Sequence, residues 1–242
     1  MNSYDLIAPV YDSATGDRKS MAARVRKWIG KHRLEPVRVL ELACGTASVL
    51  ETLPPQWEVC GIDLSKSMLR QARRKLPRGR FFCQDMTRFR LHQKFDAIIC
   101  LLDSINHITR FTGWEQTFRR VRDHLAPGGV FVCDVYTVRK LQSLDKGASF
   151  VRRIGRNYFI VRASYKGNGL VRCGILIFQN VGEGRYRLRA TEVSERAFPL
   201  PRVRRSLRKH FGSVRTYAED GRRASELANR VYFVCRYPLG PH

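Results

Sequence analysis

The sequence predicts an α/β protein with a doubly wound, mostly parallel seven-stranded sheet and a small antiparallel β-sheet inserted into it. Short apolar strands alternate with helical segments over residues 37–135, and this alternation is typical of a parallel sheet covered by helices. From about residue 147 the chain changes to longer alternating segments separated by glycine turns, which indicates antiparallel strands. We therefore expect a main domain of residues 1–140 and 200–242, with residues 141–199 as the insertion.

Each element has its own signal in the chain. The periodicity of apolar residues and the N-cap candidates Asp17 and Ser65 predict helices over 17–33, 66–76, 114–125 and 201–210. Buried-strand patterns predict the main sheet from 37–42, 57–62, 80–83, F-D-A-I-I-C, 129–135, 213–218 and 230–237. Alternating patterns predict the inserted strands over 158–165, 171–179 and 186–198.

The composition bounds the class of protein. A chain of 242 residues, 43% of them hydrophobic, can bury one core and carry an insertion. No apolar run approaches the roughly 18 residues of a membrane-spanning helix, and the N-terminus lacks a secretory pattern. The seven cysteines are dispersed without a C-x-x-C pair, which predicts reduced structural thiols in a cytoplasmic protein.

The net charge of +24 allows two interpretations. It fits an anionic partner such as nucleic acid or a phosphorylated small molecule. It also fits a chain whose arginines are spread over solvated faces. Basic clusters occur throughout both regions, without a basic tail or a zinc pattern, so we favour the second interpretation.

The segment V-L-E-L-A-C-G-T-A at residues 39–47 predicts a strand that enters a tight turn before a helix. A turn of small residues lets a ligand approach the backbone closely. The acid at the strand end, Glu41, suits a cation such as an amino group and does not suit a phosphate. Ala43 and Ala47 occupy positions where such turns usually have glycine, and we expect both to keep φ below zero.

Two further acids extend this site along the sheet edge. Asp63 ends the second strand about 20 residues after Glu41, where a carboxylate can accept hydrogen bonds from both ribose hydroxyls. Asp85 and Met86 follow the third strand, where they can meet an adenine ring. An amino-acid end, a ribose and an adenine on three successive strands predict S-adenosylmethionine as the ligand. A dinucleotide-binding turn would need glycine at position 48, which is Ser48.

Five segments, in order along the chain, resemble the motifs of class I S-adenosylmethionine-dependent methyltransferases. They are E-L-A-C-G-T-A, G-I-D-L-S-K-S-M-L, Q-D-M, F-D-A-I-I-C-L-L-D-S-I-N-H-I and L-A-P-G-G-V-F-V-C-D-V. The resemblance covers residues 4–136 and the final strand, and it implies a Rossmann-like fold. It also implies a cofactor-binding set of Tyr11, Glu41, Ala43, Cys44, Gly45, Asp63, Leu64, Met68, Asp85, Met86 and Leu101.

The methyl acceptor is expected beyond the fourth and fifth strands, near Asp103, Asn106, His107 and Tyr136. His107 could take a proton from an amine or hydroxyl or could be a helix-start histidine bonded to backbone carbonyls. Tyr11 could aim its hydroxyl at the acceptor or could pack the N-terminal segment. The chain is similar to a subgroup that includes N,N-dimethyltransferases of nucleotide-linked amino sugars, in which Tyr11 and His107 match positions beside the acceptor.

The main hypothesis is a metal-independent methyltransferase acting on the N or O of a small molecule, with His107 and Tyr11 as catalytic residues. An anionic acceptor suits the basic surface. A second hypothesis keeps the cofactor and makes RNA the substrate, and a third is a cofactor-binding protein without turnover. No paired Asp and His set suggests a metal site, and we expect a monomer or homodimer.

Overall fold

The computed structural model describes residues 3–15, 18–30, 37–144, 149–225 and 227–238. Within these ranges every helix is too short or too polar to serve as a transmembrane segment. Asp17, the predicted N-cap of the first long helix, lies outside the described residues. The helix itself, α3, comprises Lys19–Gly30.

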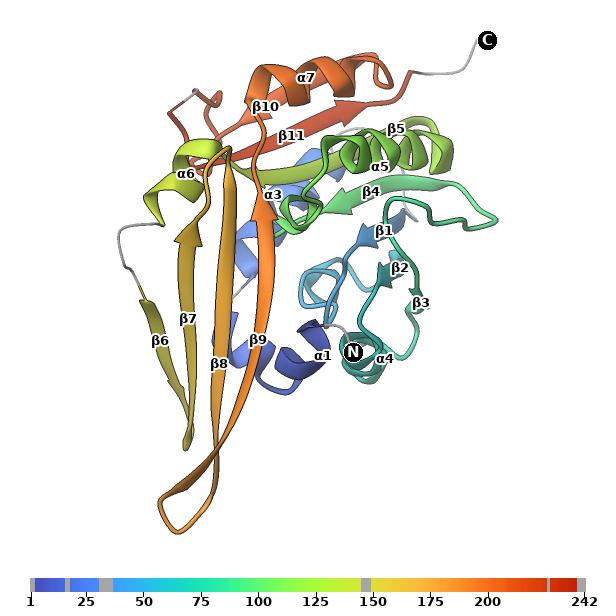
Figure 1. The fold of residues 1–242 in the computed structure, drawn as a ribbon. Helices are drawn as coiled ribbons and strands as arrows, with labels where there is room; N and C mark the ends of the chain where they lie inside the picture. Colours follow the sequence, from blue (N-terminus) through green and yellow to red (C-terminus); the bar gives the residue numbers. More distant parts are fainter. Residues whose placement is uncertain (1–2, 16–17, 31–36, 145–148, 226, 239–242) are drawn as a thin grey trace.

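The main sheet has seven strands in the order β10-β11-β5-β4-β1-β2-β3 (Figure 1). The strands are β1 (Arg38–Leu42), β2 (Glu58–Asp63), β3 (Arg80–Cys83), β4 (Phe95–Cys100), β5 (Leu125–Tyr136), β10 (Ser213–Tyr217) and β11 (Arg230–Arg236). The first five are mutually parallel, and β11 is antiparallel to both β5 and β10. All six residues of β4 are buried, as expected for a central strand covered on both faces. The predicted α/β fold is confirmed.

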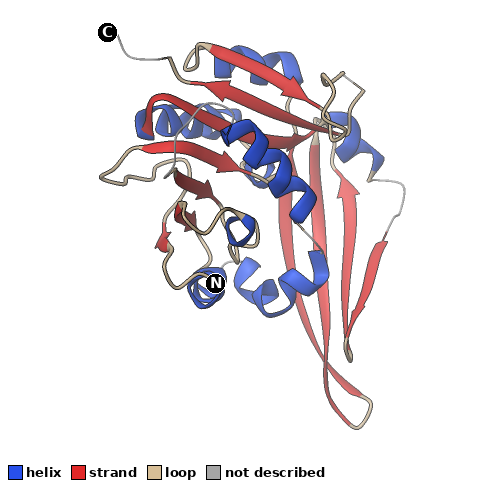
Figure 2. Cartoon of the chain, turned by 180° about the vertical axis from the view of Figure 1, so that it is seen from behind, coloured by secondary structure: helices blue, strands red, loops and turns tan. Residues whose placement is uncertain are grey.

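Helices cover both faces of this sheet (Figure 2). On one face α5 (Phe111–His124) and α7 (Leu200–Arg208) pack through Trp114, Phe118 and Leu207. On the other face α3 and α4 (Lys66–Lys75) pack through Val25 and Leu69. Short helices between the strands are η2 (Leu50–Thr52), η3 (Ser104–His107) and α6 (Val138–Ser143). The predicted N-cap of α4 is confirmed, because the Ser65 hydroxyl accepts a hydrogen bond from the backbone N–H of Met68 at 3.1 Å.

The insertion forms a four-stranded antiparallel sheet in the order β6-β7-β8-β9. Its strands are β6 (Ser149–Ile154), β7 (Asn157–Tyr165), β8 (Leu170–Gly182) and β9 (Arg185–Arg196). The sequence predicted three of these strands and missed β6, which pairs only with β7 at the sheet edge. The β8–β9 hairpin projects away from the main sheet (Figure 1). The division of the chain at residues 140 and 200 stays a prediction.

The N-terminal segment lies between the two sheets, as the helices α1 (Ser3–Ile7), η1 (Ala8–Val10) and α2 (Tyr11–Thr15). Its apolar residues Ile7 and Ala8 are buried against Met68 of α4 and against Phe159 and Ile175 of the small sheet. The segment therefore connects the insertion to the main domain. The sequence did not predict these short helices.

The conformation expected for the two turn alanines was wrong. Ala43 has φ of 50° and Ala47 has φ of 61°, so both adopt the left-handed region. A side chain there brings Cβ close to the following carbonyl oxygen and costs about 1–2 kcal/mol. The tight turn after β1 imposes this backbone whichever residue occupies it.

We expect Ala43→Gly to raise the free energy of unfolding by about 0.5–1 kcal/mol, because the relief of left-handed strain exceeds the added entropy of the unfolded chain. Urea unfolding followed by circular dichroism measures the change. The control is Ala72→Gly inside α4, which should lower stability by about 1 kcal/mol. A loss of stability in Ala43→Gly would contradict the strain assigned to this turn.

Candidate active site

The sheet topology brings the predicted acids to one edge. Strand β1 pairs with β2, and β2 pairs with β3, all in parallel, so their carboxyl ends point the same way. Glu41 lies near the end of β1, Asp63 ends β2, and Asp85 lies two residues after β3. Ligands of open α/β sheets bind at this edge.

Glu41 is the buried acid of the site, with 3% of its surface exposed. Its Oε2 atom has no hydrogen-bond partner. Burial raises the pKa of Glu41 well above its usual value, the nearby Asp63 charge raises this pKa further, and Arg18 opposes both. The Nε atom of Arg18 is also buried without a partner. An ammonium group and a carboxylate on one ligand would satisfy both side chains.

Asp63 is fixed by backbone donors on both sides. The Gly45 N–H donates to Oδ2 at 2.8 Å, and the Ser65 N–H donates to Oδ1 at 2.7 Å. Burial raises the pKa of Asp63, and these hydrogen bonds oppose the shift. The adjacent Leu64 exposes 55% of its surface, which leaves an apolar side chain beside the carboxylate. The predicted ribose contact by Asp63 thus has a pre-oriented acceptor.

The turn after β1, which contains Cys44 and Gly45, packs closely against β2. Cys44 is buried, and a Cβ added at Gly61 of β2 would lie 2.5 Å from its Sγ atom. Gly45 has φ of 54°, and the space that a Cβ would occupy there lies 4.0 Å from the ring of Tyr11. The turn therefore packs against β2 through Cys44 and against the N-terminal segment through the Tyr11 ring.

Four predicted cofactor residues have contacts within the protein. Asp85 accepts hydrogen bonds from the N–H and hydroxyl of Thr87, both at 2.8 Å, so its contact with adenine stays a prediction, as does that of Met86, which packs against the core. Met68 and Leu101 are only 1% and 2% exposed. Their side chains pack inside the protein, and their contact with the cofactor stays a prediction.

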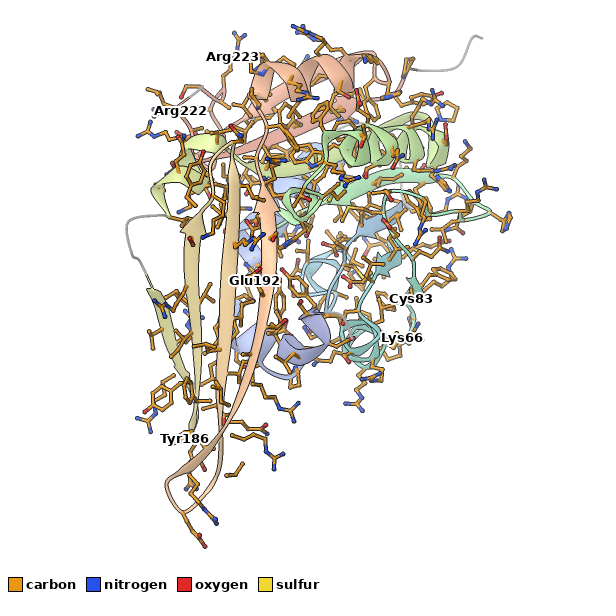
Figure 3. The ribbon with its side chains drawn as sticks, viewed as in Figure 1. Lys66, Cys83, Tyr186, Glu192, Arg222 and Arg223 are labelled. Atoms are coloured by element: carbon orange, nitrogen blue, oxygen red, sulfur yellow. The ribbon has the colours of Figure 1, made fainter. Side chains whose placement is uncertain are left out.

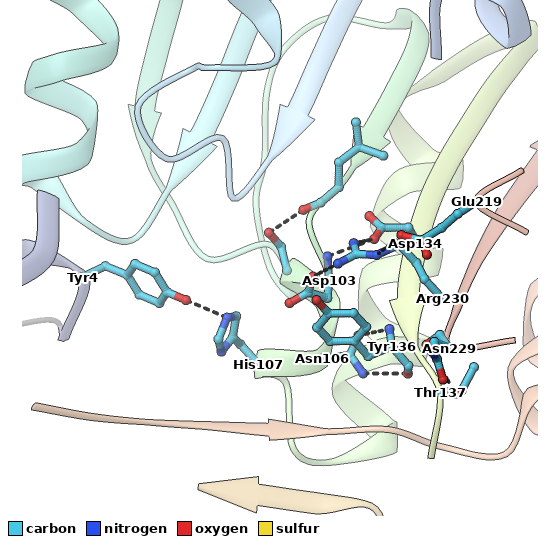
Figure 4. Close-up of polar contacts among 12 residues, drawn as sticks. Tyr4, Asp103, Asn106, His107, Asp134, Tyr136, Thr137, Glu219, Asn229 and Arg230 are labelled. Atoms are coloured by element: carbon cyan, nitrogen blue, oxygen red, sulfur yellow. Dashed lines mark hydrogen bonds and ion pairs between the residues drawn. The ribbon is translucent and has the colours of Figure 1, made fainter. Parts of the chain in front are cut away.

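Both ring nitrogens of His107 have hydrogen-bond partners, and Figure 4 shows the one with Tyr4. Its Nδ1 lies 3.3 Å from the Ser194 carbonyl, which can only accept, so Nδ1 carries the hydrogen. Its Nε2 then accepts from the Tyr4 hydroxyl at 2.8 Å. Burial lowers the pKa of His107. The histidine is therefore neutral with both nitrogens engaged, and a catalytic role for it stays a prediction.

Tyr4 is the residue that sequence reasoning missed. It lies edge-on to both Tyr11, with ring centroids 6.2 Å apart, and His107, at 5.4 Å. Burial raises the pKa of both tyrosines, that of Tyr11 to about 12, so both hydroxyls stay protonated. A signal was present, because the dipeptide Tyr-Asp occurs at residues 4–5 and again at 11–12.

The aspartates of these two dipeptides bind the N-terminal segment to the main domain. Asp5 accepts hydrogen bonds from the Ser65 hydroxyl at 2.7 Å and from the Ser67 N–H at 3.1 Å, at the N-terminus of α4. Asp12 accepts from the Thr46 hydroxyl at 2.5 Å and pairs with Lys75 at 2.5 Å. Each aspartate thus binds the main domain while its neighbouring tyrosine faces the site.

The acceptor side is built around Arg230 (Figure 4). Its guanidinium bonds to Asp134 and to Asp103, the latter at 2.7 Å, and lies over the Tyr136 ring with 4.3 Å to the centroid. Burial raises the pKa of Asp103, and Arg230 opposes this shift. Asp103 is therefore engaged as an ion-pair partner, and a substrate contact by Asp103 or Tyr136 stays a prediction.

Asn106 connects η3 to both sheets. It is fully buried, and its Nδ2 donates to the carbonyls of Tyr136 at 3.2 Å and Arg196 at 3.1 Å. Its Oδ1 accepts from the Tyr136 N–H at 3.0 Å. Both of its donors and one of its two acceptor positions are used, and a substrate contact by Asn106 stays a prediction. Among the described residues, no group of three or more His, Cys, Asp or Glu is arranged to hold a metal ion.

The structure is an α/β domain in which the acids Glu41 and Asp63 lie at the carboxyl ends of adjacent parallel strands. Comparison with known proteins agrees with this class. Residues 39–129 match the family model for a methyltransferase domain. A solved S-adenosylmethionine-dependent methyltransferase from Clostridium acetobutylicum ATCC 824 is 26% identical over 98% of this chain and 100% of its own, with a TM-score of 0.85. Residues 39–129 thus match a methyltransferase domain, and the chain as a whole is similar to an S-adenosylmethionine-dependent methyltransferase.

Two curated relatives act on amino sugars. The dTDP-3-amino-3,4,6-trideoxy-alpha-D-glucopyranose N,N-dimethyltransferase of Streptomyces venezuelae is 29% identical over 67% of each chain. The dTDP-3-amino-3,6-dideoxy-alpha-D-glucopyranose N,N-dimethyltransferase of Streptomyces fradiae is 31% identical over 54% of this chain and 51% of its own. The chain thus spans about half to two thirds of the length of the curated relatives it matches. The comparisons give no support to RNA as substrate.

We expect Glu41→Gln to stabilise the ligand-free protein and to weaken binding of S-adenosylmethionine by roughly 2–5 kcal/mol, the usual cost of removing one partner of a buried charge pair. The folded-state pKa of Glu41 is raised, so its contribution to stability is greatest at low pH and is lost as pH rises through that pKa. An ammonium ligand selects the ionised form, so the affinity of the wild-type protein should increase with pH. Urea unfolding and calorimetry between pH 5 and 8 measure both effects; unchanged affinity in Glu41→Gln would contradict the assignment.

Tyr4→Phe should raise the pKa of His107 toward its usual value, because the hydroxyl donates to the neutral imidazole and so favours that form. An NMR titration of the His107 ring measures the shift. Tyr158→Phe, at an exposed tyrosine of β7, is the matched control and should change nothing. A His107 pKa that is the same in both variants would show that the Tyr4 contact does not hold the ring.

Proposed function

We propose that this protein is an S-adenosylmethionine-dependent methyltransferase whose acceptor is the amino nitrogen of a small, nucleotide-linked sugar. The observation that carries the proposal is the buried Glu41 Oε2 atom without a partner, placed at the sheet edge where the family binds its cofactor. A carboxylate buried in this way is costly unless a cation meets it. The two sugar N,N-dimethyltransferases among the relatives support the acceptor class.

The described residues fit the cofactor. Glu41 would receive its amino group, Arg18 its carboxylate and Asp63 its ribose hydroxyls, while Leu64 offers an apolar side chain beside Asp63. When bound, S-adenosylmethionine supplies a methyl group already activated on a sulfonium. The protein is then left with orientation, exclusion of water and handling of the acceptor's proton.

The N-terminal segment performs the first two tasks. Tyr11 lies over the turn after β1, and Tyr4 and His107 hold one another beside it. Asp5 and Asp12 fix this segment to α4 and to the turn. The segment thus closes the site from water on one side, and the neutral Tyr4–His107 pair orients the acceptor without taking its proton.

A basic surface suits a nucleotide-linked acceptor, because the phosphates of the nucleotide are attracted by the net charge of +24. The charged side chains are dispersed, with Arg222 and Arg223 on the surface far from the N-terminal segment (Figure 3). A cytoplasmic location and a monomeric or dimeric state stay predictions.

The test is methyl transfer from methyl-labelled S-adenosylmethionine to dTDP-3-amino-3,6-dideoxy-alpha-D-glucopyranose, followed by mass spectrometry of the sugar. We expect one or two methyl groups on the amino nitrogen. Asp63→Ala should weaken cofactor binding by at least tenfold, about 1.4 kcal/mol, because it removes the ribose acceptor. Asp220→Ala, at an exposed acid in a surface turn, is the control. Cofactor binding without transfer to this or any other amino sugar would refute the acceptor class.

A further inference from the structure

The acceptor side of the site holds more carboxylates than cations. Arg230 is surrounded by Asp103, Asp134 and Glu219, and each of its three guanidinium nitrogens faces one of them: Nη2 faces Asp103, Nη1 faces Asp134, and Nε lies 3.5 Å from Glu219. A fourth acid, Glu195 of β9, lies in the same electrostatic neighbourhood. Its side chain forms no hydrogen bond or ion pair with any residue that the structure describes. In a protein of net charge +24, this local excess of acid requires an explanation.

The backbone of β9 fixes Glu195 against the site. The carbonyl of Ser194, before it, accepts from His107, and the carbonyl of Arg196, after it, accepts from the Asn106 side chain. Glu195 pairs with Val171 of β8, which is fully buried, so its side chain lies on the inner face of the small sheet. This face is the one that meets the main domain.

The charges that act on Glu195 come from every element packed around it. The Glu195 carboxylate raises the pKa values of Tyr4 on α1, Asp103 after β4 and Tyr136 at the end of β5. Burial raises the pKa of Glu195 itself to about 7, and Arg230 on β11 opposes that shift. On β9, Glu195 lies between Ser194, whose carbonyl contacts His107, and Arg196, whose carbonyl contacts Asn106. It is therefore next to η3, where the acceptor is expected.

The other candidates for a proton acceptor are already engaged. His107 uses both ring nitrogens. Asp103 is bound to the guanidinium of Arg230 at 2.7 Å, so its negative charge is compensated. Asp134 keeps one buried oxygen, Oδ1, without a partner, but its Oδ2 is paired with Arg230. Among the described acids of this cluster, Glu195 is the one without an ion-pair partner.

We propose that Glu195 receives the amino group of the methyl acceptor and takes its proton; this inference rests on the proposed function. An acceptor of the form R–NH3+ transfers one proton to the Glu195 carboxylate, giving R–NH2 and the neutral carboxylic acid. The N–H bond breaks, its electron pair stays on nitrogen as the lone pair, and an O–H bond forms on Glu195. The proton passes to bulk water before the next turnover. The chemical class of acceptor selected in this way is a primary or secondary amine, in preference to an alcohol.

The test compares Glu195→Gln with Glu192→Gln. Gln keeps the size of the side chain and removes the base. Glu192 is three residues away on the same strand, exposed, and on the opposite face of the sheet beside Arg172 (Figure 3). The amine probe is dTDP-3-amino-3,6-dideoxy-alpha-D-glucopyranose, and the alcohol probe is the same nucleotide sugar with a hydroxyl in place of the amine.

We expect Glu195→Gln to lower kcat/KM for the amine probe by about 100-fold or more, the usual effect of removing a positioned base. The wild-type kcat/KM should rise with pH through about 7 as Glu195 loses its proton. In Glu195→Gln this limb should move to the pKa of the amine itself, and Glu195→Asp should restore part of the wild-type profile. Glu192→Gln should match the wild type. An unchanged pH profile in Glu195→Gln would overturn the proposal.

A measurement of acceptor binding tests the role of Glu195 independently of the proposed methyl transfer. With S-adenosylhomocysteine present, calorimetry should show that the wild type binds the amine probe more tightly than the alcohol probe, and that Glu195→Gln loses this preference while its affinity for S-adenosylhomocysteine stays the same. If the preference is present without any methyl transfer, the proposed function fails and Glu195 remains an amine-binding residue. If the wild type binds both probes equally, or binds neither, the role of Glu195 is refuted.

Discussion

Two carboxylates without an ion-pair partner among the described residues, the buried Glu41 and the partly buried Glu195, constrain this site more than any other feature. Glu41 lies near the end of β1 in the main sheet, and Glu195 lies on β9 in the small sheet. Burial raises the pKa of both, because a charge removed from water is costly unless another charge meets it. A protein with so many arginines could have paired them, and it pairs Asp103 and Asp134 in just this way. The two acids left without a partner therefore mark where two cationic groups, one on the cofactor and one on the acceptor, complete the structure.

The sequence predicted the parts of this site that local pattern controls. The order of strands and helices, the N-cap at Ser65 and the acids at the ends of β1 and β2 all follow from runs of a few residues, and the structure brings these acids to one edge. The sequence did not predict the contacts between segments that are distant along the chain. Asn106 was expected to bind substrate, but its side-chain amide donates to the backbone carbonyls of Tyr136 and Arg196. Neither partner is near Asn106 in the sequence, so local pattern could not reveal these hydrogen bonds. Glu195 was missed because an acid in an alternating strand is usually a solvated residue.

The turn after β1 shows the limit of a local argument. Alanine in place of glycine was expected to be tolerated at little cost with φ below zero, whereas Ala43 and Ala47 both have positive φ. The turn must bring Gly45 N–H to the Asp63 carboxylate while Ala47, fully buried, packs beneath it. These two requirements fix the backbone, and the residues bear the strain. Strain of this kind is frequent at ligand sites, where the surrounding structure over-determines the conformation.

The N-terminal segment shows how the chain holds a short helical stretch between its two sheets. Its apolar side chains pack between α4 and the small sheet, but this packing alone does not fix its rotation. The two aspartates do, because Asp5 binds the N-terminal donors of α4 and Asp12 binds Thr46 of the turn and Lys75 at the end of α4. Two longer side chains add to this attachment, because Gln71 of α4 donates to the Ala8 carbonyl and Arg152 of β6 donates to the Ala14 carbonyl. With the segment held in this way, Tyr4 reaches His107 and Tyr11 lies over the turn. The bonds that attach the segment therefore also place its two tyrosines.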